Sequence, residues 1–383
     1  MRIKIVSALL FCSVLVGNVF AAGWDNPVVG TRGIAMGYAY TGAVDDASAV
    51  FWNPAGLTQI EKGKTSAEFR LMFLPTVVYT MQDTDGTEYE STGGGVSPEG
   101  FVAISKGDLA FGMGLYSAYG AGGMSFEGVP FMGMIANVES TVGFYSLGLS
   151  AAYKVLPDLS IGGTWEIEYG MMKTNTTFLG VGSYDYDYSG LAGHRFALGM
   201  LYSAVPGLNF GLQIKSEVDI EMEGKAVEFG VANNDSKFEH KLPYYILAGI
   251  AFRASPKMLL SFDYAYRMWG SVEEYILNNA TIKTNWRNNS SFSLGAEYTA
   301  EKFVFRGGVS FTEKAMDPDY LNALAAAEGD LLSLTAGVGY KINADVEIST
   351  AYVHGMALET ENPQGQKFSA FTPVVTVAVR STF

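Results

Sequence analysis

Cysteine and histidine are scarce in this sequence. Its 383 residues include one cysteine, Cys12, and three histidines, His194, His240 and His354. Cys12 lies in the first 21 residues, which we expect to be removed from the mature chain, so disulfides and thiolate catalysis are excluded. None of the histidines has the spacing of a metal motif such as His-Glu-x-x-His. We therefore expect no metal, no cofactor and no enzymatic activity.

Residues 1–21 have the features of a secretory signal peptide. Arg2 and Lys4 supply positive charge, Ile5 to Val16 forms a short apolar stretch, and Ala21 suits the last position before cleavage. The apolar stretch is shorter than the ~18 residues of a membrane anchor. The sequence thus predicts export from the cytoplasm.

Basic residues and long apolar runs are also lacking. The chain has 25 Lys and Arg against 39 Asp and Glu, a net charge of −14, which argues against a nucleic-acid partner. Charged residues make up only 17% of the chain, and no apolar run beyond residue 21 reaches the ~18 residues of a membrane helix. So much apolar surface must lie in a soluble core or face lipid from a β-barrel.

Most of the sequence from Thr65 onward alternates between apolar and polar residues with a period of two. Leu159 to Met171 and Phe210 to Met222 are examples, each with one apolar face and one polar face. Stretches of this length match the ~9–11 residues that a tilted strand needs to cross a bilayer. If the apolar faces meet lipid, these charged residues should point into the barrel: Glu166, Glu168, Glu217, Asp219, Asp263 and Arg267.

The connections between these stretches alternate in length. Short turn signals occur near residues 106–108, 156–158, 205–207, 255–257, 300–302 and 343–345. Long polar connections lie between them, near residues 80–99, 120–139, 173–188, 222–238, 270–286, 313–330 and 357–369. Short turns on one side and long loops on the other are typical of outer-membrane barrels. The sequence predicts an all-β fold, a fourteen-stranded antiparallel transmembrane β-barrel over residues 64–383; a soluble sandwich is the alternative.

Residues 22–63 break this pattern. Asp45 or Asp46 can cap a short helix over residues 47–52, which Asn53 and Pro54 would end. The segment is small for an autonomous domain and too apolar for a solvated linker. We expect it to form a hatch, or plug, folded into the barrel lumen; a periplasmic tail is the alternative.

The hatch segment resembles a known family. The runs Gly33-Ile34-Ala35-Met36-Gly37 and Asp45-Asp46-Ala47-Ser48-Ala49-Val50-Phe51-Trp52-Asn53-Pro54-Ala55-Gly56-Leu57 are similar to the N-terminal signature of the FadL/TodX family. These are outer-membrane transporters of long-chain fatty acids and other hydrophobic compounds. The resemblance implies a monomer in the bacterial outer membrane.

The resemblance also implies a transport mechanism. Ligand would enter an apolar groove among the extracellular loops and move to an inner pocket lined by barrel wall and hatch. Asn53, Pro54, Ala55 and Gly56 match the hatch motif, which would rearrange to open a path. Trp24 falls where the family tends to carry an aromatic residue that enters the pocket. Since burial gains roughly 0.8 kcal/mol per CH₂, a hatch that deforms the pocket would aid release.

Sideways exit is the last implied step, through a gap at the third strand. That strand is predicted over Leu109 to Tyr119, and the glycines Gly120, Gly122 and Gly123 follow it. Such a cluster can kink a strand or break its pairing, or it can simply make a loop flexible.

Four further predictions concern single sites. Phe51, Arg267 and Arg306 are candidate ligand contacts, the two arginines for a carboxylate head group, with Lys215 as a third basic candidate. The stripe Tyr184-Asp185-Tyr186-Asp187-Tyr188 suggests an aromatic girdle, with calcium binding by its aspartates as the alternative. Residues 317–328 suggest a short helix at the rim. Phe383 resembles the terminal aromatic residue that barrel-assembly machinery reads.

Transport of a hydrophobic small molecule is therefore the predicted function, with outer-membrane lipid and the assembly machinery as partners. A general diffusion porin and a structural or adhesive barrel are the alternatives. The apolar hatch counts against an open porin, while a permanent plug is compatible with a structural barrel.

Overall fold

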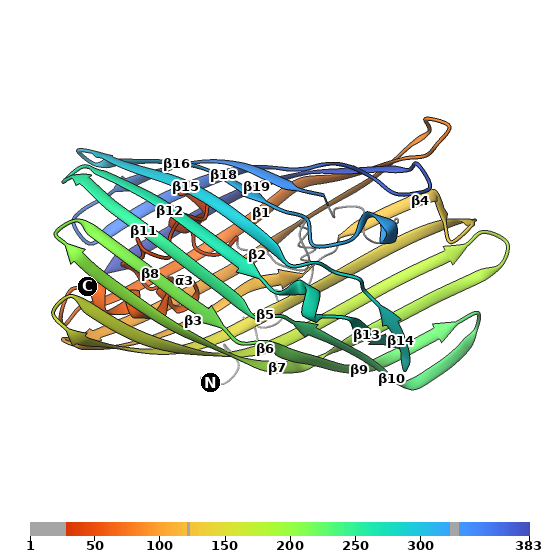
Figure 1. Ribbon diagram of the computed structural model, residues 1–383, viewed down its shortest axis with the longest axis horizontal. Coiled ribbons are helices and arrows are strands. Elements are labelled where there is room, and N and C mark those ends of the chain that lie inside the picture. The colour runs from red at the N-terminus through yellow and green to blue at the C-terminus, as the bar shows by residue number, and fades with distance from the viewer. Residues whose placement is uncertain (1–27, 121–122, 322–328) are drawn as a thin grey trace, which may run out of the picture.

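The computed structural model describes residues 28–383, apart from residues 121–122 and 322–328. The predicted signal peptide, Trp24 and Gly122 lie outside the described residues. In the described part, the strands form one antiparallel sheet that closes into a barrel, because β1 (Thr65–Gln82) pairs with both β2 (Glu88–Lys106) and β19 (Lys367–Thr382). Figure 1 shows this barrel from the side. No helix in these residues is long and apolar enough to cross a membrane.

Fourteen strands make up the wall, as the sequence predicts. Three of them are interrupted and carry two labels each: β3 with β4, β8 with β9, and β10 with β11. The remaining wall elements, in chain order, are β3 (Leu109–Gly120), β4 (Met124–Phe131), β5 (Met134–Leu156), β6 (Leu159–Phe178), β7 (Gly182–Val205), β8 (Leu208–Lys215), β9 (Val218–Glu228), β10 (Val231–Leu242), β11 (Tyr245–Ser255), β12 (Met258–Arg267), β15 (Asn289–Ala300), β16 (Phe303–Thr312), β17 (Leu331–Lys341) and β18 (Val346–Glu361).

The connections alternate as predicted, but the long ones are mostly not irregular loops. All six short turns are present at one end of the barrel. At the other end most strands continue as β-hairpins that turn at residues 83–87, 132–133, 179–181, 229–230 and 362–366. An added hairpin, β13 (Glu274–Leu277) and β14 (Ala280–Lys283), follows the short helix η2 (Trp269–Ser271) and pairs with β10. Since short turns face the periplasm in such barrels, the hairpins face outward.

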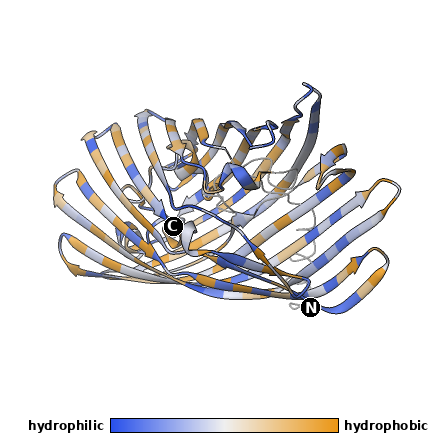
Figure 2. Ribbon diagram, turned by 45° about the vertical axis from the view of Figure 1, so that its right-hand side comes forward, coloured by the Kyte–Doolittle hydropathy of each residue, from blue (hydrophilic) through white to orange (hydrophobic). Residues whose placement is uncertain are grey.

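The outer surface of the wall is apolar in the half nearer the short turns. Along β3, for example, Phe111, Met113 and Leu115 are exposed, while Ala110 is buried. Figure 2 shows this alternation of hydrophobic and hydrophilic residues along many strands. Exposed apolar side chains on consecutive strands form the face that a bilayer would cover.

One predicted face is wrong beyond Lys215. Phe210 and Ile214 face outward as expected, but Val218, Ile220 and Met222 are buried inside, and Asp219 is exposed with Glu217 half-exposed. The break at residues 216–217 between β8 and β9 reverses the two faces. Because β9 extends beyond the bilayer, its outer side meets water, and its apolar residues turn to the lumen.

The hatch, defined here as residues 28–63, lies inside the barrel near the short-turn end (Figure 1). It contains the helices α2 (Thr31–Ala35) and α3 (Ala49–Trp52), and the 3₁₀ helix η1 (Pro54–Gln59). Helix α3 begins at Ala49 instead of residue 47, so it is shorter than predicted. Ser48 stands at its N-cap position, and its amide and hydroxyl donate hydrogen bonds to the carboxylate of Asp46. Asn53 ends α3 as expected.

At the rim, the predicted helix over residues 317–328 is only partly described. A 3₁₀ helix, η3, covers Pro318–Tyr320, and its start is capped by Asp317, which accepts from the amide of Asp319. The rest of that prediction lies outside the described residues.

Candidate functional site

The hatch motif is pinned to the barrel wall by Asn53. Its side-chain amide donates to the carbonyl of Thr41 within the hatch and to that of Met200 on β7, each at 3.0 Å. Its oxygen accepts from the amide of Ala55 at 3.2 Å. The buried Asn53 side chain therefore both stabilises the turn into η1 and holds this turn against the barrel wall.

Glycines in the wall make this docking possible. A Cβ on Gly199 of β7 would lie 2.2 Å from Oδ1 of Asn53, and one on Gly162 of β6 would lie 2.6 Å from the backbone carbon of Pro54. Any side chain at these two positions would push the hatch inward. The close approach explains how such short hatch elements reach both neighbouring strands.

Further contacts hold η1 and α3. The hydroxyl of Thr58 donates to that of Ser160 on β6 at 2.7 Å, and Gln213 on β8 donates to the carbonyl of Phe51 at 2.9 Å. Thr164 on β6 donates to the carbonyl of Val50 at 2.9 Å. The inner faces of β6 and β8 thus supply polar partners for the hatch backbone.

On the opposite side, a network of charges joins the hatch to the wall. Arg32 donates from Nε and Nη2 to the two carboxylate oxygens of Glu297 on β15, at 2.7 and 2.9 Å. Arg32 also pairs with Asp45, and Asp46 accepts from Arg380 on β19 at 3.0 Å. Most of these side chains are buried, so removing one partner would leave an uncompensated buried charge and destabilise the fold.

Arg306 belongs to this charge network rather than to an apolar pocket. Its side chain is 2% exposed and lies 2.8 Å from Glu297 and 2.9 Å from Glu347. The network lines a polar cleft of about 420 Å³ at the short-turn end, and Lys341 and Asp345 also belong to the lining. The placement does not bring Arg306 together with Phe51.

The charge network also changes the pKa of Asp46 in the hatch. Burial by itself would raise the pKa of its carboxyl, but the charges of Arg380 and Arg32 and a hydrogen bond from Ser48 outweigh burial and lower the pKa. The carboxylate therefore stays ionised, and keeps its partners, below the pH at which an exposed aspartate is protonated.

Above the hatch lies a second polar layer. Glu166 on β6 accepts from the hydroxyl of Tyr116 at 2.7 Å and from Lys215 at 3.0 Å. Lys215 sits over the ring of Phe51, 4.1 Å from its centre. The structure thus brings together two of the predicted ligand contacts, Phe51 and Lys215. The ammonium group of Lys215 is, however, already paired with the carboxylate of Glu166.

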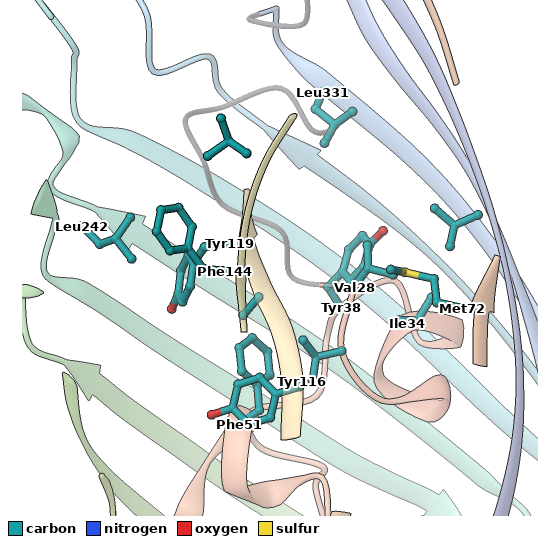
Figure 3. Close-up of a cluster of buried hydrophobic side chains, with 14 of the residues drawn as sticks. Val28, Ile34, Tyr38, Phe51, Met72, Tyr116, Tyr119, Phe144, Leu242 and Leu331 are labelled. Atoms are coloured by element: carbon teal, nitrogen blue, oxygen red, sulfur yellow. The ribbon is translucent and has the colours of Figure 1, made fainter. Parts of the chain in front are cut away.

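Beyond this layer the inward side chains become apolar and aromatic. Figure 3 shows Phe51 beside Tyr116, with Tyr119, Phe144 and Leu242 further along the lumen. Towards the outer end, rings follow one another along the inner wall, with centroid separations of 6.1 Å for Tyr188 and Phe238, 6.2 Å for Phe238 and His240, 5.2 Å for His240 and Trp286, and 4.5 Å for Trp286 and Trp269.

Sequence reasoning missed most of these outer residues because it placed them in loops or on the lipid face. In β9, Asp219 and Glu221 alternate with Ile220 and Met222, a pattern that fits a lipid-facing strand with its charges in the lumen equally well. The structure instead buries Ile220 and Met222 inside the barrel, beyond the break at residues 216–217. The alternation of residues alone therefore did not indicate this reversal.

Arg267 and the unpredicted Arg195 lie at one level of this inner surface. Arg267 donates to the hydroxyl of Ser291 at 2.5 Å and sits 5.5 Å from the ring centre of Tyr245. Arg195 lies on the same ring at 4.5 Å and donates to the hydroxyl of Tyr119 at 2.6 Å. Arg267 therefore borders the aromatic surface, well separated along the sequence and the wall from the charge network around Arg306.

The wall is interrupted between β2 and β3. Their ladder runs from Lys106 opposite Leu109 to Gly100 opposite Leu115 and stops there. All five residues from Tyr116 to Gly120 are buried, so the strand leaves the alternating wall and bends into the lumen. Beyond the bend, β4 pairs with β5.

Glycines surround this interruption. Gly120 and Gly123 have φ angles of 150° and 75°, a range that disfavours other residues. A Cβ on Gly93 of β2 would lie only 1.9 Å from the carbonyl oxygen of Gly123. Two of the three predicted glycines thus stand at a real break in the ladder, and Gly122 lies outside the described residues.

Glu99 connects the hatch with this break. Its Oε1 lies 2.5 Å from Nη2 of Arg70, and the same nitrogen donates to the carbonyl of Val28 in the hatch at 2.7 Å. Oε1 also accepts from the amide of Ser117 in the bent part of β3, at 3.4 Å. One buried carboxylate therefore touches both parts that the predicted mechanism requires to move.

Two remaining predictions can be placed. Tyr184, Tyr186 and Tyr188 stack along β7, with successive ring centres 6.3 Å apart, while Asp187 between them is exposed. Within the described residues there is no group of three or more His, Cys, Asp or Glu side chains that could hold a metal ion. Phe383 is exposed, and its backbone exchanges two hydrogen bonds with Thr65 next to the hatch.

Comparison with known proteins identifies relatives of the whole chain. The family profile described as outer membrane protein transport protein (OMPP1/FadL/TodX) matches residues 12–381. A search of curated proteins finds no match.

Solved structures with the same fold include a FadL homologue of Pseudomonas aeruginosa and two toluene transporters. The FadL homologue is 14% identical, with a TM-score of 0.73 over 96% of this chain and 99% of that one. TodX of Pseudomonas putida is 15% identical, with a TM-score of 0.74 over 95% and 99%. TbuX of Ralstonia pickettii is 20% identical, with a TM-score of 0.70 over 92% and 98%.

Proposed function

Because the chain belongs to the OMPP1/FadL/TodX family of outer membrane transport proteins, we propose that it carries hydrophobic molecules inward across the outer membrane. The ligand enters among the outer hairpins, follows the aromatic inner surface to the level of Phe51 and Tyr116, and leaves sideways between β2 and β3. The observation that carries this proposal is the coincidence of an apolar inner surface with a break in the wall at the same level. Tyr119 beside the break is paired with Phe144 of that surface.

The proposed route keeps an apolar ligand out of water, which lowers its free energy. An apolar molecule gains roughly 0.8 kcal/mol per buried CH₂ group when it leaves water, so a dry path is favourable at every point. The hatch blocks the direct aqueous path to the periplasm, because nearly all its residues are buried against the wall. An open diffusion porin would need that path to be free.

Release requires that the hatch and the break move together. We infer that Glu99 couples them, since it holds Arg70 next to Val28 of the hatch and accepts from Ser117 of the bent strand. When the hatch shifts, Arg70 loses its contact with Val28, and the Glu99 carboxylate is free to move away from Ser117. The bent segment can then widen the gap to β2.

A disulfide between the hatch and the wall tests this coupling. The hydroxyls of Thr58 and Ser160 are 2.7 Å apart, so a Thr58→Cys/Ser160→Cys pair would bring two thiols close together across this contact. The wall pair Ser293→Cys/Ser310→Cys is the matched control, with hydroxyls 2.9 Å apart on β15 and β16. We expect the oxidised hatch pair to slow uptake of a labelled hydrophobic compound and a reductant to restore it, with no effect in the control. Unchanged uptake through the oxidised hatch pair would contradict hatch gating.

A further inference from the structure

We propose that the tips of three adjacent outer hairpins dock onto the surface of an undissolved, uncharged apolar phase, such as a droplet of the transported compound. These apolar tips are the turns at residues 132–133, 179–181 and 229–230 with the residues that flank them. The inference rests on the proposed function and adds a source to it, because the compound is then taken from a droplet surface as well as from solution.

Each of these turns places a glycine between two apolar residues. The triplets are Met132-Gly133-Met134, Leu179-Gly180-Val181 and Phe229-Gly230-Val231. Two other hairpin turns at this end have the polar composition that turns ordinarily have, since residues 83–87 read Asp-Thr-Asp-Gly-Thr and residues 362–366 read Asn-Pro-Gln-Gly-Gln. The apolar composition is therefore specific to one group of turns.

The backbone of two apolar turns does not favour the residues found there. Met132 and Phe229 have positive φ angles of 52° and 48°, and the glycines that follow have 77° and 80°. Two-residue turns with two positive φ angles favour Asn-Gly, because Asn adopts this region more readily than a bulky apolar residue. The turn between β13 and β14 has Asn278 and Asn279 at 50° and 63°. Local exceptions of this kind point to function.

The apolar side chains of the turns are exposed. The exposed fraction is 70% for Met132, 55% for Leu179, 59% for Val181, 47% for Phe229 and 74% for Val231. The bilayer around the barrel does not cover them, because the exposed charges of β9 stand between the tips and the lipid-facing half of the wall. Contiguous apolar surface that a fold leaves exposed marks an interaction site.

The three tips lie side by side. The amide of Leu179 donates to the carbonyl of Ile135 at 3.0 Å, and the amide of Phe229 donates to the carbonyl of Ser183 at 2.9 Å. The hairpins β4–β5, β6–β7 and β9–β10 are thus hydrogen-bonded to one another up to their turns, at the end of the barrel away from the short turns (Figure 1). They present one surface.

The composition of this surface indicates what covers it. The triplets contribute no side-chain hydrogen-bond donor or acceptor, whereas protein interfaces carry about one hydrogen bond per 100–200 Å². Residues 125–140, 172–188 and 222–237 around the turns contain seven acidic and three basic side chains, while anionic membranes attract basic segments. An uncharged apolar liquid requires neither hydrogen bonds nor basic residues.

The apolar tips also continue into the inner aromatic surface. The ring centre of Phe178 lies 6.2 Å from that of Phe131 and 6.3 Å from that of Phe229. Phe229 contacts Tyr184 at 4.8 Å, and the tyrosine stripe leads from there to the buried Tyr188. A molecule that leaves a droplet at the tips therefore meets aromatic rings along its way into the lumen.

Flotation with hexadecane droplets tests the docking. Full-length protein in nanodiscs of zwitterionic lipid would be mixed with the droplets, and the fraction that rises with them would be compared with that of empty nanodiscs. The tip variant, Met132→Asn/Leu179→Thr/Val231→Thr, leaves the packed ring of Phe229 in place. It should bind roughly tenfold more weakly than wild type, because burial of a single exposed apolar side chain already favours binding by a factor of this size.

The matched control changes two polar turns, as Thr84→Asn/Gln364→Thr, and should bind droplets as wild type does. Wild-type discs that rise no more than empty ones, or a tip variant that binds like wild type, would overturn the proposal. Tighter binding to phosphatidylglycerol vesicles than to droplets would also overturn it and identify a membrane, and association of the discs with one another without droplets would identify a second copy.

Met132→Asn alone separates docking from folding. Because Asn suits the turn, amide exchange in residues 124–140 should be no faster than in wild type, while droplet binding falls. Faster exchange together with weaker binding would show that Met132 supports the hairpin itself, against the proposal.

Uptake distinguishes failure of this inference from failure of the proposed function. Cells with this chain would receive labelled naphthalene dissolved either in water or in hexadecane droplets. The tip variant should lose uptake from droplets and keep uptake from water. Equal loss from both sources would overturn the droplet role and leave transport intact. If wild-type cells take up naphthalene from neither source while the discs still rise with droplets, the transport proposal fails and the docking stands.

Discussion

Removing Arg32 should release the hatch without unfolding the barrel. In the charge network, the carboxylates of Asp45, Asp46, Glu297 and Glu347 face the guanidinium groups of Arg32, Arg306 and Arg380. The substitution Arg32→Met leaves four carboxylates facing two cations and removes the two hydrogen bonds to Glu297. Breaking a buried ion pair from one side costs about 3–5 kcal/mol. Because these contacts hold the hatch and not the wall ladders, the cost falls on hatch docking.

Hydrogen–deuterium exchange on the purified protein measures this effect directly. At about 1.4 kcal/mol per factor of ten, the lower figure predicts that hatch amides exchange at least roughly a hundredfold faster in Arg32→Met, while wall strands keep their rates. The control is Lys367→Met, which breaks an exposed pair with Glu359 at 2.9 Å and should cost at most about 1 kcal/mol. Hatch exchange within threefold of wild type, or equal acceleration in the wall, would refute the reasoning.

Three shorter predictions follow. Asn53→Ala removes three hydrogen bonds of the hatch and should weaken its docking by about 1–3 kcal/mol, measured as faster proteolysis of the hatch in the folded barrel. Because the pKa of Asp46 is lowered, its stabilising pairing with Arg380 is complete above the ordinary aspartate pKa of 3.8 and is lost only as pH falls through the lowered pKa. The hatch amides should therefore be as protected from hydrogen exchange at pH 5 as at neutral pH. Loss of that protection at pH 5 would contradict this reasoning. Gly93→Ala should force β2 away from Gly123, and spin labels across the gap should report a larger separation than in the wild type; an unchanged separation would contradict this.

Much of the fold could be predicted from the sequence because the membrane imposes a regular pattern. Apolar residues at every second position and the alternation of short and long connections gave fourteen strands, and both features depend on local sequence. The reversal in β9 could not be obtained from periodicity alone. The alternation between Val218 and Met222 is the same as in a lipid-facing strand. Only the position of the bilayer edge decides whether the outer face of the strand meets lipid or water.

The candidate site was predicted less completely because its contacts are long-range. The motif around Asn53 is local and was found, but its partner Met200 lies on β7 and only the closed barrel brings the two together. Arg306 and Lys215 were reasonable head-group contacts when taken singly. The fold pairs them with Glu347 and Glu166, and such pairing depends on strand register across the sheet.

Concentration-dependent uptake tests the central claim most directly. Cells that lack their own transporter of hydrophobic compounds would receive this chain, and initial uptake of a labelled compound would be measured over a range of concentrations, with barrel insertion checked in the isolated outer membrane. Transport through a binding surface predicts saturable uptake above the level of cells without the chain. Uptake that stays at the level of those cells for a panel of aliphatic and aromatic compounds, from a correctly inserted barrel, would contradict the account and favour a structural role.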